Sequence, residues 1–372
     1  MSKPIRILHV LGKLDLAGAE TFVMNIYRNI NRSSVQFDFV VHGNDIGYYE
    51  SEIEKLGGNI YRAPKYRVIN SVEYRYWWKC FFEEHPIYKV IHCHVRSTAN
   101  IILKVAKEKK LVTIAHSHSI SNGKGIVARI KNFNQRNINQ FADYKFACSE
   151  RAGEWLFGDK EDFSIIKNGI PVEKFKFDIT KRDYFRKSHN IENKDVYGHI
   201  GRFTKEKNHN FLIETFKNIS EKNSDAILLL IGTGPLEEKT RKKIIVEGLK
   251  DKVIFLGLQK DISTFLSGID IFIFPSLYEG LGIVLIEAQA AGLPCVVSEN
   301  IPKEAMLSEL ITSYPIENPK DFAVYSAVTG NKIMSFKDRE MYNGLIKESG
   351  YDCLDISIYL QKFYKKLALS LK

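Results

Sequence analysis

The sequence predicts an α/β protein made of two doubly wound domains in tandem, with a shared cleft at the carboxyl ends of both sheets. The main observation is that short apolar runs alternate with amphipathic segments of helical period, which is typical of a parallel sheet covered on both faces. The alternation runs through residues 5–147 and starts again at residue 196. A length of 372 residues also favours two domains over one.

The first half of the sequence predicts six strands with helices between them, because apolar residues recur there at strand and helix spacings. A polar, basic and weakly periodic segment near residues 172–192 follows a turn cluster at 168–171 and predicts the domain linker. The predicted strands are residues 5–11, 37–42, 59–61, 90–93, 111–115 and 144–147, and the predicted helices are residues 21–30, 45–56, 72–82, 97–109 and 126–141.

The second half predicts a similar alternation up to residue 298, after which the pattern weakens until a final amphipathic helix at 355–371. We expect domains at residues 1–175 and 190–354. The predicted strands are residues 196–200, 226–231, 253–256, 269–274 and 295–298, and the predicted helices are residues 208–219, 237–247, 262–267 and a helix that begins at Gly282.

The composition, with 44% hydrophobic and 26% charged residues, is that of a soluble globular protein. No apolar run is long enough to span a membrane. Gly12 and Lys13 interrupt the first apolar run, which therefore predicts a strand and not a signal peptide. The five cysteines have no metal or redox spacing, which fits a reducing cytoplasm.

The net charge is +10, and most of the excess lies in residues 1–178. A basic first half indicates an anionic partner, either a membrane surface or nucleic acid. The alternative explanation is a lysine-rich proteome.

The stretch FPSLYEGLGIVLIEAQAAGLP at 274–294 predicts a ligand site after a strand. Glu279 lies in the loop, Gly282 opens a helix, and Glu287 follows within that helix. The free N–H groups of residues 282–284 suit a phosphate. Carboxylates repel phosphate, so the two acids are expected to accept hydrogen bonds from sugar hydroxyls, which indicates a nucleotide-sugar site. The alternatives are a general acid/base pair, two metal ligands, or acids that complement the helix dipole.

Arg202 and Lys207 directly follow the first strand of the second domain, and two cations at this spacing suit a diphosphate. The loop GTGPLE at 232–237 resembles the start of a dinucleotide fingerprint, but Glu237 replaces the third glycine. The loop therefore predicts a tight strand-to-helix turn and not a NAD site.

Four histidines close two neighbouring strands of the first domain. His92 and His94 close one strand, and His116 and His118 close the other. They could form a metal site, but no carboxylate stands nearby as a further ligand, so satisfied core or loop histidines are the default expectation. A functional role is favoured for His116, which follows directly on its predicted strand.

A basic and aromatic cluster occupies residues 66–82. It could dock at a membrane interface, form a core helix whose apolar face holds Tyr74, Trp77 and Phe81, or bind nucleic acid. No nucleic-acid motif accompanies it, so nucleic acid is not an expected partner. The cluster is Tyr66, Arg67, Tyr74, Arg75, Tyr76, Trp77, Trp78, Lys79, Phe81 and Phe82.

Taken together, these motifs resemble the retaining glycosyltransferases of family 4, which have the GT-B fold. The resemblance covers nearly the whole chain and is weakest in 40–85 and 300–350. In the first half, AGAETFVMNIYRNI, IHCH, IAHSHS and KNGIP are similar to a subgroup that builds bacterial capsular and exopolysaccharides. The matching positions of the second half are Gly201-Arg202-Phe203, Lys207-Asn208, Gly232-Thr233-Gly234-Pro235, residues 253–257, Asp270, Pro275-Ser276, Glu279-Gly280, Glu287 and Ala291-Gly292-Leu293-Pro294.

The resemblance implies a nucleotide-diphosphate sugar donor held mainly by the second domain, transfer with retention, and no required metal. It implies that Arg202 and Lys207 hold the pyrophosphate, that Glu279 accepts from the donor sugar, and that Glu287 accepts from the ribose. The implied catalytic set is His116, Glu279, Arg202 and Lys207; the implied donor-binding set is Gly18, Arg202, Lys207, Phe255, Glu279, Gly280, Gly282, Ile283, Val284 and Glu287.

In the first domain, the resemblance makes Gly18 the point where a loop approaches the donor phosphate or the acceptor. His116 matches the family's active-site histidine, and His118 is the alternative. The family usually has two glycines where this chain has Ala17 and Gly18, so a methyl group at Ala17 alters that loop. The C-terminal helix at about 355–372 is expected to pack back on the first domain.

The predicted function is a retaining, metal-independent glycosyltransferase that extends a lipid-linked glycan in bacterial surface polysaccharide synthesis. The expected donor is a UDP-sugar, and no cofactor is expected. The expected acceptor is a lipid-linked glycan or an oligosaccharide. We expect a cytoplasmic protein that is peripheral on the inner, anionic membrane face. The alternatives are another GT-B activity, such as a nucleotide-sugar epimerase or a glycosyltransferase with a soluble acceptor, or a catalytically dead sugar-nucleotide-binding protein. The candidate donors are UDP-N-acetylglucosamine, UDP-glucose, UDP-galactose and GDP-mannose.

Overall fold

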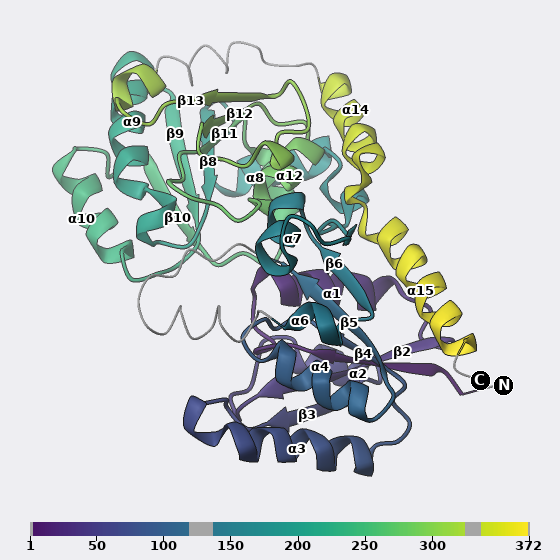
Figure 1. Cartoon of the computed structure of the whole chain (residues 1–372). Coiled ribbons are helices and arrows are strands. Elements are labelled where there is room, and N and C mark those ends of the chain that lie inside the picture. Colours follow the sequence, from purple (N-terminus) through teal and green to yellow (C-terminus); the bar gives the residue numbers. More distant parts are fainter. Residues whose placement is uncertain (1–2, 119–136, 324–335, 371–372) are drawn as a thin grey trace. The chain divides into compact units, whose positions relative to one another are not determined.

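The computed structural model describes residues 3–118, 137–323 and 336–370. The chain divides into two compact units (Figure 1). Unit 1 consists of Met1–Ile170 and Gly350–Lys372, and unit 2 consists of Pro171–Ser349. Within the described ranges, no helix combines the length and apolar character that crossing a bilayer requires.

Unit 1 contains a seven-stranded parallel sheet in the order β3-β2-β1-β4-β5-β6-β7. The chain moves outward from β1 to β3 and then returns to place β4 on the other side of β1, as in a Rossmann-like sheet. The strands are β1 (Ile5–Val10), β2 (Val35–His42), β3 (Ile60–Ala63), β4 (Val90–Cys93), β5 (Val112–Ser117), β6 (Tyr144–Ala147) and β7 (Ser164–Ile165).

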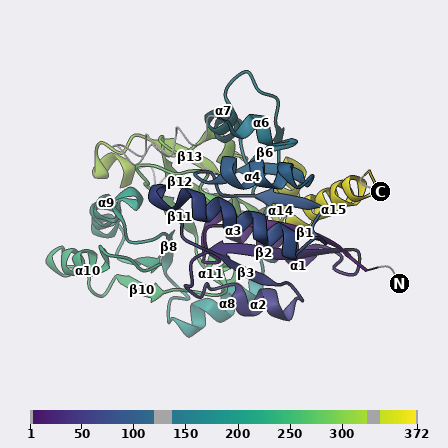
Figure 2. The ribbon, with the colours of Figure 1, turned by 60° about the horizontal axis from the view of Figure 1, so that its bottom comes forward.

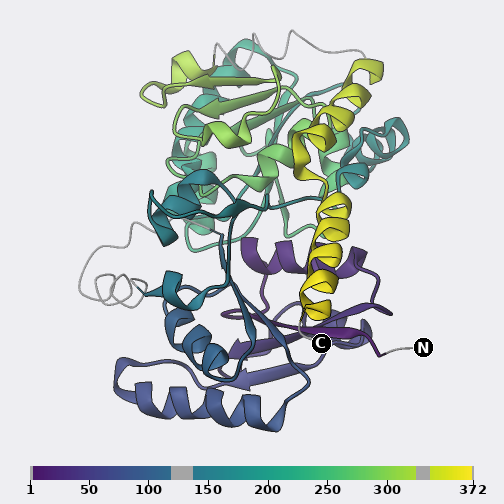
Figure 3. The same ribbon diagram turned by 45° about the vertical axis from the view of Figure 1, so that its right-hand side comes forward.

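Helices cover both faces of this sheet, and alternate strand residues reach each layer. Ile7 and Val90 pack toward α1 and α15, whereas Leu8 and Ile91 pack toward α3 and α4. Figure 3 shows α15 (yellow) beside α1 (purple). Leu360 of α15 belongs to the same buried apolar cluster as residues of α1. The helices are α1 (Gly18–Asn29), α2 (Glu50–Lys55), η1 (Val68–Asn70), α3 (Ser71–Glu84), α4 (Ala99–Glu108), α6 (Ile138–Phe141), α7 (Glu150–Phe157) and α15 (Cys353–Leu369).

Unit 2 contains a six-stranded parallel sheet in the order β10-β9-β8-β11-β12-β13. The same reversal falls here between β8 and β11, so ligand-binding loops are expected at the carboxyl ends of these strands. The strands are β8 (Asp195–Ile200), β9 (Ala226–Ile231), β10 (Val253–Gly257), β11 (Ile271–Phe274), β12 (Cys295–Ser298) and β13 (Ile311–Tyr314).

Helices accompany these strands, and the last of them continues into unit 1. The helices are η2 (Val172–Phe175), α8 (Ile179–Ser188), η3 (Lys205–Lys207), α9 (His209–Lys222), α10 (Glu237–Val246), α11 (Ile262–Gly268), α12 (Ile283–Ala290), η4 (Lys303–Ala305), α14 (Phe336–Ile346) and η5 (Lys347–Tyr351).

These two sheets confirm the predicted α/β class with Rossmann-like domains. The segment 172–192 differs from the linker that we expected, because it forms η2 and α8. Helix α8 packs on α11 through the buried Phe185, which contacts Phe265, and through charged residues. Arg182 and Arg186 both pair with Asp270, and the buried Arg186 also donates to the Gly268 carbonyl at 2.9 Å. The apolar period is weak because arginines make several of these contacts.

Other differences concern the limits of elements. Strand β5 runs to Ser117, so His116 lies inside the strand, paired in register with Phe146, and not beyond its end. Gly18 is the first residue of α1 and not a loop residue. Helix α2 begins only at Glu50, whose carboxylate accepts from the Gly47 N–H at 2.7 Å. Most of the helix predicted at 126–141 lies outside the described residues. Weak patterns hid β7, β13, α7 and α14.

Candidate functional site

The loop after β8 carries the two predicted phosphate-binding cations of unit 2. Arg202 is exposed, and within the described ranges its guanidinium forms no ion pair. Lys207 ends η3, and its Nζ lies 2.5 Å from Glu279 Oε1 and 4.8 Å from the centre of the Phe274 ring. The lysine and glutamate side chains are only 20% and 10% exposed. The structure therefore joins Lys207 and Glu279 directly.

Hydrogen bonds to backbone carbonyls hold the two loops that carry this pair against each other. The Leu277 N–H donates to the Glu206 carbonyl at 2.7 Å, and the Asn208 side-chain amide donates to the Pro275 carbonyl at 3.3 Å. Asn208 adopts the left-handed conformation with φ 57°, which asparagine tolerates better than most residues. The cation and the carboxylate are thus presented by a fixed frame.

The glycines of the GTGP loop allow a close approach between the β8 and β9 loops. A Cβ at Gly232 would lie 2.1 Å from the Gly201 carbonyl oxygen, and one at Gly234 would lie 2.7 Å from the Phe203 carbonyl oxygen. The Phe203 N–H donates to the Thr233 carbonyl at 3.0 Å. The loop is a tight packing turn, as the sequence predicts.

Helix α12 begins directly after the loop of Glu279. Its N-cap, Gly282, has φ 79°, and a Cβ built there would lie 3.8 Å from Glu279 Cγ. The first N–H groups of a helix have no intrahelical partner, so Gly282, Ile283 and Val284 present donors at this point. The N–H groups that could bind a phosphate therefore lie next to Glu279, which pairs with Lys207.

Glu287 lies one turn further along α12 and is half-buried. Burial raises the pKa of its carboxyl to about 8, and Lys174 offsets this only in part. At pH 7 the carboxyl is therefore largely neutral, and it can both donate and accept a hydrogen bond.

The three remaining donor-site candidates are Phe255, Gly18 and Gly280, and a Cβ at Gly280 would meet no atom within 4 Å. The Phe255 ring stacks on Phe203 with centroids 5.8 Å apart and lies 3.7 Å below the Arg241 guanidinium carbon. A Cβ at Gly18, in unit 1, would meet no atom within 4 Å, so packing does not require a glycine there.

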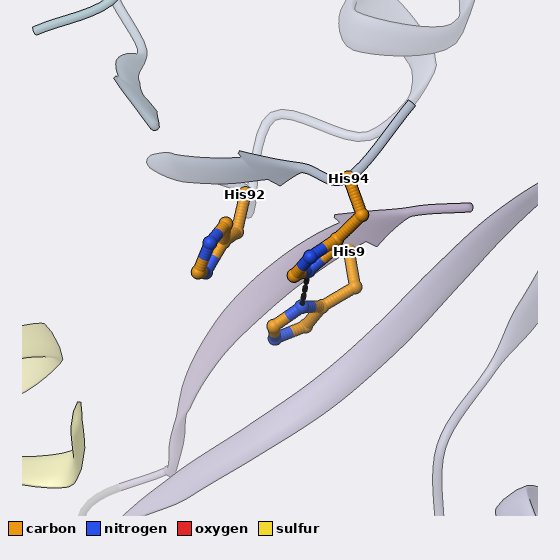
Figure 4. A group of neighbouring side chains, drawn as sticks. All are labelled: His9, His92 and His94. Carbon is orange, nitrogen blue, oxygen red and sulfur yellow. Dashed lines mark hydrogen bonds between the residues drawn. The ribbon is translucent and has the colours of Figure 1, made fainter. Parts of the chain in front are cut away.

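Unit 1 contains a cluster of five histidines from three adjacent strands, and three of them are drawn in Figure 4. His9 Nδ1 lies 2.9 Å from His94 Nε2, and His94 Nδ1 lies 2.8 Å from His118 Nε2. The chain of rings ends at Asn168, whose Oδ1 is 3.2 Å from His118 Nδ1.

A second chain runs beside the first. The Tyr364 hydroxyl of α15 lies 2.7 Å from His92 Nδ1, and His92 Nε2 lies 3.2 Å from His116 Nδ1. The rings of His116 and His118 stack with centroids 4.0 Å apart. His116 is buried and His118 is half-buried at the end of its strand.

Neutral rings can make every hydrogen bond of the first chain. When His118 Nδ1 donates to Asn168, a neutral His118 accepts at Nε2 from His94, and a neutral His94 accepts at Nε2 from His9. Burial favours these neutral forms, since it lowers the pKa of His9 to about 3 and that of His118 to about 4. Burial also lowers the pKa values of His92, His94 and His116.

The same nitrogens could serve as metal ligands. Within the described residues, His9, His92 and His94 offer nitrogens that lie within 4.8 Å of one another, as do His94, His116 and His118. The rings of His92 and His94 are nearly parallel, at 23° with centroids 4.3 Å apart. Parallel stacked rings direct their lone pairs along separate planes, which suits the hydrogen-bonded chains better than a shared ion.

Comparison with known proteins decides the family. Residues 181–323 match the family model of the glycosyl transferases group 1. Over 368 residues, 93% of each chain, the sequence is 31% identical to the putative glycosyltransferase EpsF of Bacillus subtilis (strain 168). The chain belongs to the group 1 glycosyl transferases.

One further relative and one solved structure of similar fold are informative. This glycosyltransferase is 30% identical over 198 residues, 51% of each chain, to the Escherichia coli UDP-Gal:alpha-D-GlcNAc-diphosphoundecaprenol alpha-1,3-galactosyltransferase. Its structure is similar to that of Anabaena Alr3699/HepE, solved in complex with UDP, with a TM-score of 0.80 and 17% identity over 98% of this chain and 100% of that chain. The prediction that the chain is a glycosyltransferase with the GT-B fold is confirmed.

The structure of this glycosyltransferase brings several predicted residues together and adds others. Lys207, Glu279 and Gly282 meet within unit 2, and His116 and His118 join one cluster in unit 1. Sequence analysis missed His9, Asn168 and Tyr364. A signal for His9 existed, because it lies in β1 in register with His92, so their side chains share a face.

Proposed function

We propose that this glycosyltransferase transfers a sugar, with retention and without a metal, from a UDP-sugar to a lipid-linked glycan in bacterial surface polysaccharide synthesis. The observation that carries the proposal is the pairing of Lys207 with Glu279 beside the N-cap of α12, with an exposed Arg202 on the same loop as Lys207. Departure of the nucleotide builds negative charge on the diphosphate, and fixed cations and helix N–H groups stabilise that charge. A metal ion is not needed for this role.

In this proposal, Lys207 and Glu279 bind different parts of the donor. The diphosphate takes Lys207 as its counterion, and Glu279 is then released to accept from the hydroxyls of the sugar. Their existing ion pair keeps both charges compensated before the donor arrives, which lowers the cost of holding them only partly exposed. Glu287, largely neutral at pH 7, meets the ribose hydroxyls.

The relatives support the choice of donor and acceptor to test first. HepE was solved with UDP and with UDP-glucose, and the E. coli relative is named for UDP-Gal and a diphosphoundecaprenol-linked sugar. The Staphylococcus aureus relative, 34% identical over 136 residues, is named for capsular polysaccharide biosynthesis. These names support our proposal that the enzyme acts at the cytoplasmic membrane face.

A panel of nucleotide sugars tests this proposal on the purified chain. We expect a UDP-sugar to raise the melting temperature more than GDP-mannose does, because a ligand that binds only the folded state stabilises it. The same UDP-sugar should be consumed only with a lipid-linked acceptor, and 5 mM EDTA, about a thousandfold above trace metal, should leave the rate unchanged. Isomerisation of the donor without an acceptor would identify an epimerase, and binding without turnover would identify a dead site. A strict metal requirement would contradict the proposal and would favour the histidine cluster as a metal site.

A further inference from the structure

An open groove lies in unit 1 where β2 and β3 end. Its volume is about 940 Å³, and it is lined by three cations, by the acids Asp45 and Glu73, and by apolar side chains. The cations are Arg62, Lys65 and Arg67, and the apolar lining includes Ile69, Tyr76 and Trp77. Helix α3, which borders it, comes forward in Figure 2. The groove includes part of the basic and aromatic segment at 66–82, which the donor site of unit 2 does not use.

Four apolar side chains stand in solvent along the same edge, and we call them the apolar rim. Val68 and Ile69 of η1 are 57% and 90% exposed, and Val72 and Tyr76 of α3 are 82% and 67% exposed. Val72 and Tyr76 are four residues apart and so lie on one side of the helix. Contiguous exposed apolar side chains mark an interaction surface more often than chance.

The opposite side of α3 explains why Val72 and Tyr76 stay exposed. Tyr74, Trp78 and Phe82 are buried against the sheet and α4. The helix therefore cannot rotate to hide Val72 and Tyr76 without exposing larger aromatic rings. The aromatic cluster that the sequence predicts thus divides into a core side and an exposed side.

The charges around the rim favour an anionic partner. Residues 62–79 contain Arg62, Lys65, Arg67, Arg75 and Lys79 but a single acid, Glu73. Three of these cations have partners: Arg62 pairs with Glu50, Lys65 with Asp45, and Arg75 with Glu108. Within the described ranges, Arg67 and Lys79 form no ion pair. A second copy of this chain would bring like charges together at this surface.

We propose that the apolar rim and the groove cations dock this glycosyltransferase on an anionic bilayer. Val68, Ile69, Val72 and Tyr76 enter the boundary between headgroups and acyl chains, and Arg67 and Lys79 meet the headgroup phosphates. The inference deepens the proposed function, because it names the surface that would bring the enzyme to a lipid-linked acceptor. Docking is nevertheless measurable without any transfer.

Co-sedimentation with vesicles of phosphatidylglycerol and phosphatidylcholine, against vesicles of phosphatidylcholine alone, tests the proposal. We expect binding to the anionic vesicles that weakens at least about tenfold between 50 and 500 mM salt, since surface charges are screened. The triple variant Val68→Ser/Ile69→Ser/Val72→Ser should lose at least about tenfold of the binding, as expected when buried apolar area is removed. Arg67→Glu/Lys79→Glu should lose a similar factor.

Matched controls lie in unit 2. Ile245 and Val246 are 62% and 83% exposed on α10, so Ile245→Ser/Val246→Ser removes exposed branched apolar side chains elsewhere. Lys239→Glu/Lys250→Glu makes the same charge change at exposed positions. Each control should bind vesicles like the wild type, and each variant should keep the wild-type melting temperature and its shift by the UDP-sugar.

Three outcomes would overturn the inference: no vesicle binding by the wild type in 50 mM salt, equal losses in the rim variant and its control, or a wild-type dimer that the rim variant abolishes. The failure of the proposed function is recognised separately, because it appears as no shift by any nucleotide sugar whether or not vesicles bind.

Discussion

The carboxyl edges of the two sheets share a topology but differ in their electrostatics. In each sheet, the central strands follow the same order and polar side chains collect where those strands end. The edge of unit 2, which we call the charged edge, presents Arg202, Lys207 and Glu279 as charged groups that are at least partly exposed. The edge of unit 1, which we call the neutral edge, holds five imidazoles that are neutral because they are buried and hydrogen-bonded to one another. The comparison teaches that this topology sets where a site lies, while side chains and burial set its chemistry.

The largest effect should follow when the cations of the charged edge are removed. Lys207→Ala or Arg202→Ala should lower kcat/KM at least about 100-fold, as the loss of one preorganised donor to a developing charge does. Steady-state kinetics with the UDP-sugar and acceptor measures this. Lys205→Ala is the matched control, because Lys205 is exposed in the same short helix.

Because Arg202 is exposed, its variant should keep the wild-type melting temperature, which separates catalysis from folding. A rate close to that of the wild type in both Lys207→Ala and Arg202→Ala would contradict the assignment of the charged edge to the diphosphate.

The neutral edge should make unit 1 sensitive to acid. The pKa of His9 is about 3 in the folded chain against an ordinary value of 6.5, so the folded state excludes a proton that the unfolded chain takes up. Its contribution is complete above pH 6.5 and is lost as the pH falls toward 3. At pH 5 the loss is about 2 kcal/mol for His9 alone. The other four histidines act in the same direction.

Chemical denaturation at pH 7.5, 6 and 5 measures this dependence. His9→Gln should have a shallower pH dependence than the wild type, whereas His85→Gln, at a partly exposed position outside the cluster, should not change the slope. Identical slopes for wild type and His9→Gln would show that the cluster is charged or solvated in the folded chain.

The smallest effect should come from Glu287, which belongs to unit 2 but, like the histidines of unit 1, is largely neutral at pH 7. Since the pKa of its carboxyl is about 8, glutamine closely replaces the group at pH 7, and Glu287→Gln should change donor affinity less than about tenfold. The raised pKa means that the wild type loses stability as the pH rises from about 4.5 to 8. The variant should therefore gain stability relative to wild type between pH 5 and pH 9, measured as melting temperature. A 100-fold loss of affinity at pH 7 would show that the ionised form binds the donor.

Much of the fold was predictable because the periodicity of apolar residues reports on burial. The strands at Val90–Cys93, Tyr144–Ala147, Ala226–Ile231 and Cys295–Ser298 have the predicted limits. The prediction failed where charged residues make the packing contacts, as in α8, whose Arg182 and Arg186 satisfy Asp270. Apolar periodicity carries no information about such contacts.

The sequence by itself determined the two sheets, the strand ends at which polar residues gather, and the glycine that begins α12, since these depend on local pattern and backbone freedom. Only the tertiary structure decided which of those residues meet. Lys207 and Glu279 are 72 positions apart and become an ion pair because β8 and β11 are neighbours. His9, His94 and His118 become a neutral chain because three strands bring them into reach and the core excludes the water that would ionise them.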